Sequence, residues 1–349
     1  MQRSAVVAGA TGLVGRFILK HLADDDGWRV TALSRRSPDI AGPVEHLAVD
    51  LLDPAGARAA LASLDHATHL FYAAYVPAPS QAEIATVNTA MLVNLMDGLE
   101  PVAGGLRHVH LVQGSKWYGC HLGPYRTPAR EDDPRHLPPN FYYDQQDHLV
   151  ARRQGKAWSW SASRPHGICG FSVGSPMNLM SCLVIYAAIC RELGVPLDFP
   201  GTPENYRAVY QCTDTEHLAR AIAWIGTAPD AADQAFNVTN GDFIRWANVW
   251  PLIAETMGLP MGRVRTLTLA DWMADKEPLW DAMVARHDLR PHKLAELADF
   301  RHADFVFHPH WDIMSSTTKL RQAGFHDVVD TEAMLIRLIQ AYRADRLIP

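Results

Sequence analysis

Two types of side chain between residues 107 and 147 could do chemistry together, a lysine and a tyrosine. Lys116 lies just after the apolar run 108–112, and the stretch 140–147 opens a helical pattern with Tyr142 and Tyr143. A residue at the end of a buried strand and one at the start of a helix can meet in one cleft. A tyrosine can donate a hydrogen bond to a carbonyl oxygen, and a nearby ammonium favours its phenolate. The stretch therefore predicts proton chemistry at a carbonyl group.

A glycine-rich turn near the start of the chain indicates a phosphate site. Gly9, Gly12 and Gly15 are spaced three apart between the apolar run 4–8 and a helical pattern that extends through Leu22. Gly9 allows the tight turn, Gly12 lets the backbone approach a pyrophosphate, and Gly15 lets the helix pack on the strand. The N–H groups at the helix start then face the anion. The alternative is a glycine-rich turn without a ligand.

The end of the second predicted strand indicates which dinucleotide would bind. The strand 29–33 runs into Ser34, Arg35 and Arg36, where a site for NAD usually has an acidic residue. Guanidinium groups bind phosphate oxygens in a fork, so the arginine pair suits the 2′-phosphate of NADP. The alternative is a pair of solvated arginines. Asp50 is expected to face the adenine, and Asp53 to cap the following helix.

The elements that must position these residues follow from apolar runs that alternate with helical patterns. This alternation predicts an α/β protein with a doubly wound parallel (Rossmann) sheet and a ligand at the carboxyl ends of its strands. After residue 241, tryptophan-rich helices predict a smaller, mainly helical C-terminal substrate lobe. We expect residues 1–172 to form the NADP-binding domain, with 206–240 returning to it. Residues 173–205 and 241–349 are expected to form the substrate-binding lobe.

Composition and charge argue against several classes of partner. The net charge of −6 gives no reason to expect nucleic acid or an anionic membrane. The first three residues lead directly into an apolar strand, so no signal peptide is expected, and no apolar run has the length of a membrane span. Five scattered cysteines without a Cys-x-x-Cys pair favour reduced thiols and a cytoplasmic location. His308 and His310 lack a third ligand at metal spacing, so no metal is expected.

Further motifs, taken with those above, resemble one family closely. They are GATGLVG (9–15), SRR (34–36), GSKWYG (114–119), NFYY…D (140–147), WSWSASRP (158–165), GFSVGSPMNL (170–179), YAAIC (186–190), AFNVTNGD (235–242) and KEPLW (276–280). From Val6 to its end, the chain is similar to the progesterone 5β-reductase and iridoid synthase-like enone reductases, which are atypical extended short-chain dehydrogenases/reductases. The resemblance implies NADPH-dependent 1,4-reduction of the C=C bond of α,β-unsaturated carbonyl compounds. It also implies that Tyr142 and Lys116 are the catalytic pair.

The chain departs from ordinary members of the larger superfamily in a way that bears on the reaction. Those members carry Tyr-x-x-x-Lys on one helix face, whereas here Gln146 follows Tyr142 and Asp147 follows Tyr143 at that spacing. Gly114 replaces the usual serine or threonine, and Lys116 supplies the ammonium instead. These changes favour C=C reduction, in which no alcohol is made or oxidised.

Other departures concern the substrate. Plant members have a histidine where this chain has Trp117, and the segment 75–77 lacks their Thr-Trp pair. The segment 305–316, which would bear a substrate-wall phenylalanine, also differs. These changes leave the cofactor prediction intact and the identity of the substrate open.

The expected cofactor is NADP(H), bound by Gly9, Thr11, Gly12, Leu13, Val14, Gly15, Ser34, Arg35, Arg36, Asp50, Leu51, Ala73, Ala74, Gln113, Tyr142, Pro165, Gly167, Ile168, Ser172 and Met177. The expected substrate is a small lipophilic enone, bound by Tyr75, Trp117, Phe141, Asn178, Tyr206, Trp311 and Ile313. A homodimer is a candidate assembly. Tyr118 and Tyr143 are expected to be packing residues, and Asn88 structural support.

Two other functions fit parts of the sequence. A nucleotide-sugar epimerase or dehydratase, or a carbonyl reductase of the extended short-chain family, would need the missing serine or threonine and the missing Tyr-x-x-x-Lys. A non-catalytic NADP-sensing regulatory protein would keep the glycine turn, but such proteins often lose the catalytic tyrosine. This chain keeps both Tyr142 and Lys116.

Overall fold

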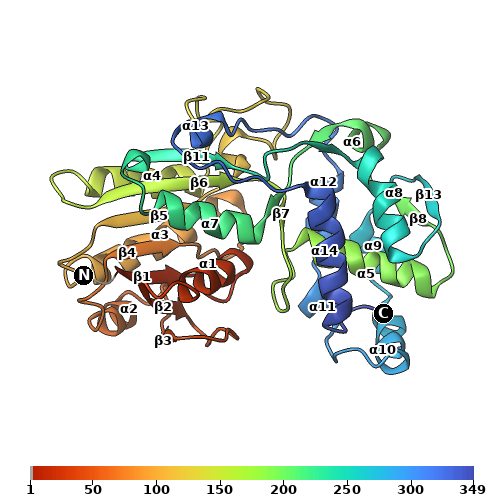
Figure 1. The fold of residues 1–349 in the computed structure, drawn as a ribbon, viewed down its shortest axis with the longest axis horizontal. Coiled ribbons are helices and arrows are strands. Elements are labelled where there is room, and N and C mark those ends of the chain that lie inside the picture. The colour runs from red at the N-terminus through yellow and green to blue at the C-terminus, as the bar shows by residue number, and fades with distance from the viewer. Residues whose placement is uncertain (1–2) are drawn as a thin grey trace.

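A seven-stranded parallel sheet forms the first part of the molecule (Figure 1). The computed structural model describes residues 3–349, so the first two residues, on which the signal-peptide expectation partly rests, lie outside the described residues. The strand order is β11-β6-β5-β4-β1-β2-β3. The strands are β1 (Arg3–Ala8), β2 (Trp28–Ser34), β3 (Val44–Ala48), β4 (His69–Tyr72), β5 (His108–Val112), β6 (Ser159–Pro165) and β11 (Gln234–Val238). The order reverses at β1, so the predicted doubly wound sheet is confirmed.

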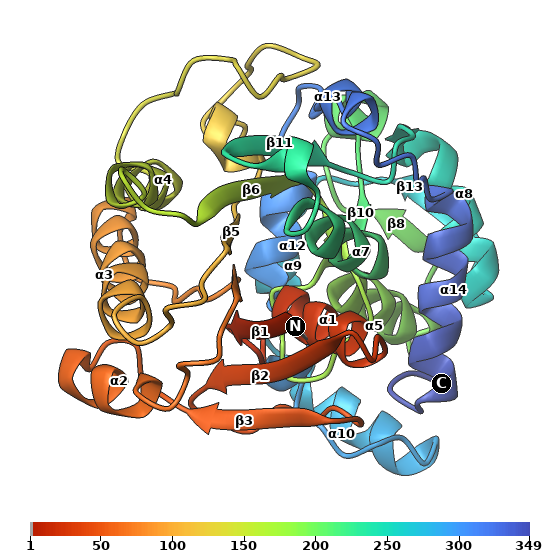
Figure 2. The ribbon, with the colours of Figure 1, turned by 60° about the vertical axis from the view of Figure 1, so that its left-hand side comes forward.

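Helices cover both faces of this sheet, as Figure 2 shows. On one face lie α1 (Leu13–Ala23) and α7 (Thr215–Ile225), and on the other α2 (Pro54–Leu61), α3 (Gln81–Leu99) and α4 (Phe141–Arg152). Each layer has its own apolar core, so the central strands are buried on both sides and consist of nearly continuous apolar runs. Asp53 caps α2 as predicted, its side chain accepting from the Gly56 N–H group.

A second, mainly helical part follows and shares a separate core. Its longer helices are α5 (Leu179–Glu192), α8 (Trp246–Met257), α10 (Glu277–Arg286), α12 (Phe300–Phe307) and α14 (Thr331–Ala344). The shorter helices are α6 (Pro203–Arg207), α9 (Leu269–Met273) and α11 (Leu294–Leu297). Three pairs of short strands complete this part: β7 (Ile168–Cys169) with β10 (Thr213–Asp214), β8 (Leu197–Phe199) with β13 (Met261–Val264), and β9 (Val209–Tyr210) with β12 (Ile244–Arg245). The fully buried Trp246, Trp250 and Trp280 lie in this core, so the tryptophan-rich lobe is confirmed.

The structure places two short segments differently from the expected division of the chain. Helix α13 (Thr318–Gln322) packs on β11, and Leu320 and Phe325 join the core on the α1–α7 face of the sheet. Conversely, α6 packs on α8, and β9 pairs with β12. Thus residues 318–325 lie with the sheet and 206–210 with the lobe, because their apolar side chains fit those cores.

Between β5 and β6 runs a buried ladder of alternating serine and histidine side chains. The rings of His108 and His110 lie opposite Ser159, Ser161 and Ser163, and each ring nitrogen is 2.6–3.0 Å from a serine hydroxyl. Residues two apart on a strand share one face, which places all five side chains in one row. We call this row the His–Ser ladder. It satisfies polar groups that would otherwise be buried without partners.

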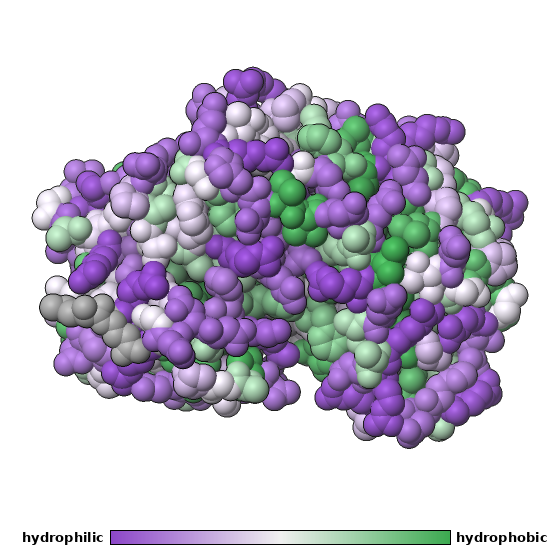
Figure 3. All heavy atoms as spheres, viewed as in Figure 1, coloured by the Kyte–Doolittle hydropathy of each residue, from purple (hydrophilic) through white to green (hydrophobic). Residues whose placement is uncertain are grey.

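The surface is hollowed between the sheet and the helical lobe, as the space-filling view in Figure 3 shows. This hollow lies at the carboxyl ends of the parallel strands, where open α/β sheets bind their ligands. Within residues 3–349, no helix combines the length and the apolarity that crossing a lipid bilayer would take.

Candidate active site

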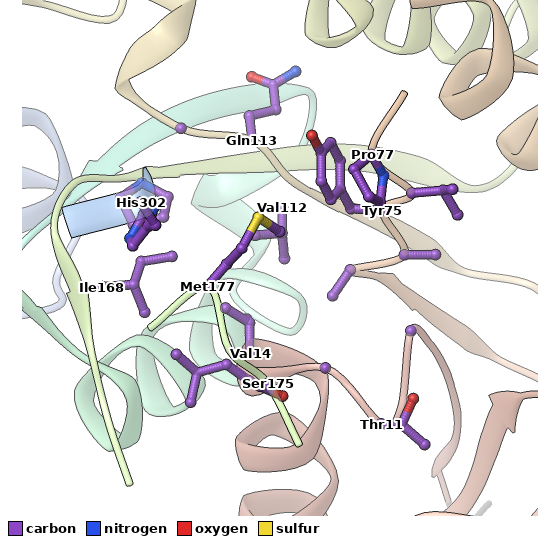
Figure 4. Close-up of a pocket in the computed structure, with 18 of the residues that line it drawn as sticks. Thr11, Val14, Tyr75, Pro77, Val112, Gln113, Ile168, Ser175, Met177 and His302 are labelled. Atoms are coloured by element: carbon purple, nitrogen blue, oxygen red, sulfur yellow. The ribbon is translucent and has the colours of Figure 1, made fainter. Parts of the chain in front are cut away.

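A cavity of about 710 Å³ lies along the carboxyl ends of β1, β4, β5 and β6, within the range typical of small-molecule sites. Helix α12 and the segment 174–177 form its far wall. In the close-up of Figure 4, Thr11 and Val14 lie at one end, and Tyr75, Pro77, Met177 and His302 line the rest.

The glycine turn has the geometry of a phosphate cradle. Gly9 has φ +81°, and a Cβ atom there would lie 2.6 Å from the backbone of Ala73. A Cβ atom at Gly15 would lie 2.2 Å from the carbonyl oxygen of Gly9, so Gly15 lets α1 pack under the turn and does not itself line the cavity. Gly12 caps α1 without a side-chain hydrogen bond, and the first turn has no acidic residue. Its N–H groups and positive dipole end are therefore available to an anion.

The structure separates the two arginines that follow β2. Ser34 and the exposed Arg35 line the cavity, whereas Arg36 does not. The Ser34 hydroxyl donates to the carbonyl oxygen of Arg36 at 2.6 Å, which fixes the backbone of the turn. Asp50, Leu51, Ala73 and Ala74 also line this end of the cavity. Only the first arginine of the predicted pair is therefore placed to meet a ligand here.

Lys116 and Tyr142 line the same cavity. Lys116 lies in a short 3-10 helix, Ser115–Tyr118, just after β5, and Tyr142 lies in the first turn of α4. One side chain joins the two: Asn140 accepts from the Tyr142 N–H group at 3.1 Å and donates to the Lys116 carbonyl oxygen at 2.9 Å. The helix cap of α4 thus sets the position of both predicted catalytic residues.

Burial shifts the pKa of both side chains. It raises the pKa of Tyr142, and Tyr75 and Cys120 raise that pKa further, so Tyr142 is a protonated phenol and a hydrogen-bond donor. Burial lowers the pKa of Lys116, whose Nζ atom lies 5.0 Å from the ring centre of Phe305. Desolvation is the largest cause of the Tyr142 shift, and it favours the phenol over the phenolate.

Gly114 leaves room beside the Tyr142 hydroxyl. A Cβ atom at Gly114 would lie 3.1 Å from the Tyr142 oxygen and 3.5 Å from the carbonyl oxygen of Pro165. A serine or threonine in this backbone position would therefore crowd the hydroxyl. The glycine lets the phenol reach the cavity past the end of β5.

Arg164 holds the back of the site together from a fully buried position. Its guanidinium donates to the Gln113 side-chain oxygen (3.0 Å) and the Tyr118 hydroxyl (3.1 Å), and lies 3.6 Å from the ring centre of Trp117. Tyr118 and Tyr143 pack in the same cluster, as predicted. The expectation that Trp117 contacts substrate is corrected, because Arg164 and Tyr143 cover its ring.

Among the other expected substrate residues, Tyr75 and Phe141 line the cavity, with ring centres 5.7 Å apart. The remaining four lie elsewhere. Asn178 is fully buried and caps α5, Tyr206 packs on Phe199, and Trp311 and Ile313 pack against the lobe core. The expectation that these four residues contact the substrate is therefore corrected. Each side chain packs in a core or caps a helix, and sequence spacing does not predict these positions.

Among the expected cofactor residues, Gln113, Pro165, Gly167, Ile168 and Met177 line the cavity, but Ser172 does not. Ser172 is buried, and its hydroxyl accepts from the Asn178 amide at 3.1 Å. The Gln113 side chain is held by Arg164 and points away from the cavity centre (Figure 4). Asn88 is structural as predicted, because its amide bonds the backbone of Val76.

Several cavity residues were missed from sequence. Helix α12 contributes His302, Phe305 and Val306, preceded by Asp299. Spacings of three and four place these on one helical face, but the sequence does not say which face meets the cavity. Other missed residues include Ser115, Cys120, His166 and Tyr210. Ser115 and His166 are hydrogen-bonded, with 2.5 Å between the Ser115 hydroxyl and Nδ1.

Solved structures of other proteins share this Rossmann-like fold. UDP-glucose 4-epimerase from Thermotoga maritima superposes with a TM-score of 0.69 at 13% identity, covering 98% of this chain and 99% of that one. A short-chain dehydrogenase/reductase superfamily protein from Agrobacterium tumefaciens, solved with bound NAD, gives 0.68 at 16% identity, covering 98% of each chain. At these identities the likeness concerns the fold alone.

The chain belongs to the PRISE-like Rossmann-fold domain family, whose sequence model matches residues 48–349. An (S)-8-oxocitronellyl enol synthase from Camptotheca acuminata is 32% identical, over 100% of this chain and 94% of that protein. The 3-oxo-Delta(4,5)-steroid 5-beta-reductase from Arabidopsis thaliana is 32% identical, over 99% and 93%. The family expected from the sequence motifs is therefore confirmed.

Proposed function

We propose that this protein is an NADPH-dependent enone reductase that reduces the C=C bond of α,β-unsaturated carbonyl compounds. The observation that carries the proposal is the pairing of Lys116 and a protonated Tyr142 in one cavity. Full-length relatives named as a steroid 5-beta-reductase and as enol synthases support the same chemistry.

The cavity fits a dinucleotide at its strand-end side. The open N–H groups at the start of α1 suit the pyrophosphate, and Arg35 suits a 2′-phosphate. Gly167 and Ile168 bring backbone close to the place expected for the nicotinamide. When bound there, NADPH supplies the hydride that adds to the β-carbon of the enone.

Tyr142 then acts on the carbonyl oxygen. As the C=C electrons move toward that oxygen, negative charge develops there, and the Tyr142 hydroxyl stabilises it by a hydrogen bond. Water protonates the α-carbon, so one hydride and one proton convert the enone to the saturated carbonyl compound. Lys116 would hold the ribose of the cofactor and keep a positive charge near the developing enolate.

Gly114 favours this reaction over alcohol chemistry. Alcohol oxidation in the superfamily uses a serine or threonine beside the tyrosine, and here a Cβ atom alone would approach the Tyr142 oxygen to 3.1 Å. A hydrogen-bond donor to the carbonyl oxygen is sufficient for hydride addition at the β-carbon.

The substrate half of the cavity supports a small lipophilic enone, because Met91, Met177, Phe305 and Val306 contribute apolar walls. We also propose a cytoplasmic location, supported by five free, buried cysteines. A homodimer stays a proposal that sedimentation tests.

Consumption of NADPH in the presence of 2-cyclohexen-1-one, cyclohexanone and UDP-glucose, each assayed alone, tests the function. We expect consumption only with the enone, and slower turnover with NADH. Consumption with cyclohexanone would indicate a carbonyl reductase, and conversion of UDP-glucose without net NADPH loss an epimerase. Binding of NADPH without turnover of any compound would indicate a sensor.

A further inference from the structure

Helix α12 brings an imidazole into the substrate half of the cavity. His302 shares one helical face with Phe305 and Val306, and all three line the cavity. In the view of Figure 4, His302 lies on the same side of the cavity as Ile168. His302 therefore lies near the end of the cavity where the proposed reaction takes place.

The His302 imidazole is neutral, and both of its ring nitrogens are free to form a hydrogen bond with a ligand. Burial and the Lys116 ammonium lower the pKa of His302, against a smaller opposing effect of Asp299. A neutral ring has one donor and one acceptor nitrogen. Within residues 3–349, no hydrogen bond reaches either ring nitrogen. Phe305, stacked on the ring at 6.4 Å between centres, offers only carbon.

A second polar group lies in the same region. Tyr210 lines the cavity, and its ring lies 4.8 Å from that of His166. In the described part of the chain, the Tyr210 hydroxyl likewise has no hydrogen-bond partner. The Nδ1 atom of His166 is hydrogen-bonded to Ser115 at 2.5 Å, whereas its buried Nε2 atom has no hydrogen-bond partner in the described part of the chain. His302 and Tyr210 are thus among the cavity's polar groups that remain free to bind a ligand, in addition to Tyr142 and Lys116.

We propose that His302 is a specificity-determining residue that hydrogen-bonds a second oxygen of the substrate. The inference rests on the proposed function and narrows the substrate class to enones that carry a hydroxyl or a second carbonyl group. An enone without that group leaves the imidazole desolvated and unpaired, which weakens its binding in the transition state.

The test compares 2-cyclohexen-1-one with its 4-, 5- and 6-hydroxy derivatives, each assayed with NADPH. We expect the wild-type enzyme to favour at least one derivative over the parent by about 10-fold in kcat/KM. His302→Phe should abolish this preference, so that the ratio of kcat/KM for the derivative to that for the parent falls to about 1. His302→Gln, which retains a donor and an acceptor, should keep most of it.

His308→Phe is the matched control, since His308 is exposed at the end of the same helix and does not line the cavity. It should leave the preference unchanged. Each preference is a ratio measured on one enzyme preparation, so partial misfolding of a variant cancels. The inference about His302 would be overturned if the preference survived in His302→Phe, or if the wild type used all four compounds equally. Either result would leave the proposed enone-reductase function standing. No NADPH consumption with any of them would overturn the proposed function as well.

Discussion

Tyr142 combines a pKa that burial raises with an open approach past Gly114. A buried phenol that stays protonated is a good donor to an oxygen on which charge develops. At the scale of single residues, the reaction therefore depends on one hydroxyl whose surroundings keep it neutral and accessible.

Replacing Tyr142 with phenylalanine removes that donor and little volume. We expect kcat/KM for an enone to fall about 100- to 1,000-fold, as for the loss of one oxyanion donor, while the Kd for NADPH stays within about 3-fold. Steady-state kinetics and a fluorescence titration measure the two quantities. Tyr206→Phe, outside the cavity, serves as control. Full activity of Tyr142→Phe with intact NADPH binding would refute the proposed role.

Substitution of each of the two arginines after β2 should have a different effect on the preference for NADPH over NADH. Arg35 lines the cavity and Arg36 does not, so only the first is placed to bind a 2′-phosphate. We expect Arg35→Ala to raise the KM for NADPH about 10-fold and to leave the KM for NADH nearly unchanged. Arg36→Ala should change neither. Equal effects of the two substitutions on NADPH would show that the cavity geometry does not decide selectivity.

At the scale of elements, Asn140 joins the 3-10 helix that bears Lys116 to the start of α4 that bears Tyr142. Asn140→Ala should lower the free energy of unfolding by about 1–2 kcal/mol, as the loss of a helix cap does, and should also lower kcat. Asp330 caps α14 at 2.9 Å, far from the cavity lining. Asp330→Ala should cost similar stability without a loss of kcat. Equal kcat values for the two variants would argue against a positioning role for Asn140.

Some of the elements that form the site could be predicted from the sequence, and others could not. The phosphate turn, β5, Lys116 and α4 were predictable because apolar runs and glycine spacing are local signals. The wall at α12 was not, since the face that a short amphipathic helix presents to a cavity depends on packing by distant elements. Trp117, Trp311 and Ile313 were misplaced for the same reason: a large side chain suits a core and a substrate wall equally well.

At the scale of the whole molecule, buried neutral histidines make stability depend on pH. Burial lowers the pKa of His108 to about 3 and of His69 to about 4, and lowers that of His110 well below its usual value. Above pH 6.5 these rings are neutral in both folded and unfolded chains and have no effect. As the pH falls below 6.5, the unfolded chain binds protons that the folded protein cannot, so stability is lost down to about pH 3–4.

We therefore expect the free energy of unfolding to fall between pH 6.5 and pH 4.5, by up to about 2–3 kcal/mol for each fully buried ring. Urea denaturation at several pH values measures the slope. His108→Phe should be less stable at pH 7.5 but should show a shallower slope in acid. His326→Phe, at an exposed position, should keep the wild-type slope. An unchanged slope in His108→Phe would show that the ladder does not control acid stability.

The His–Ser ladder also couples the tautomers of its two rings. Ser161 lies 2.6 Å from Nε2 of His108 and 2.7 Å from Nδ1 of His110, and its single hydroxyl proton can be donated to only one of them. If Ser161 donates to His108, both rings carry hydrogen on Nδ1. If it donates to His110, both carry it on Nε2. Ser159 also reaches the Arg107 carbonyl oxygen at 3.4 Å, and donation there favours the Nδ1–H form in both rings. Ring nitrogen chemical shifts would therefore report a single tautomer for the pair, and the two rings would change it together.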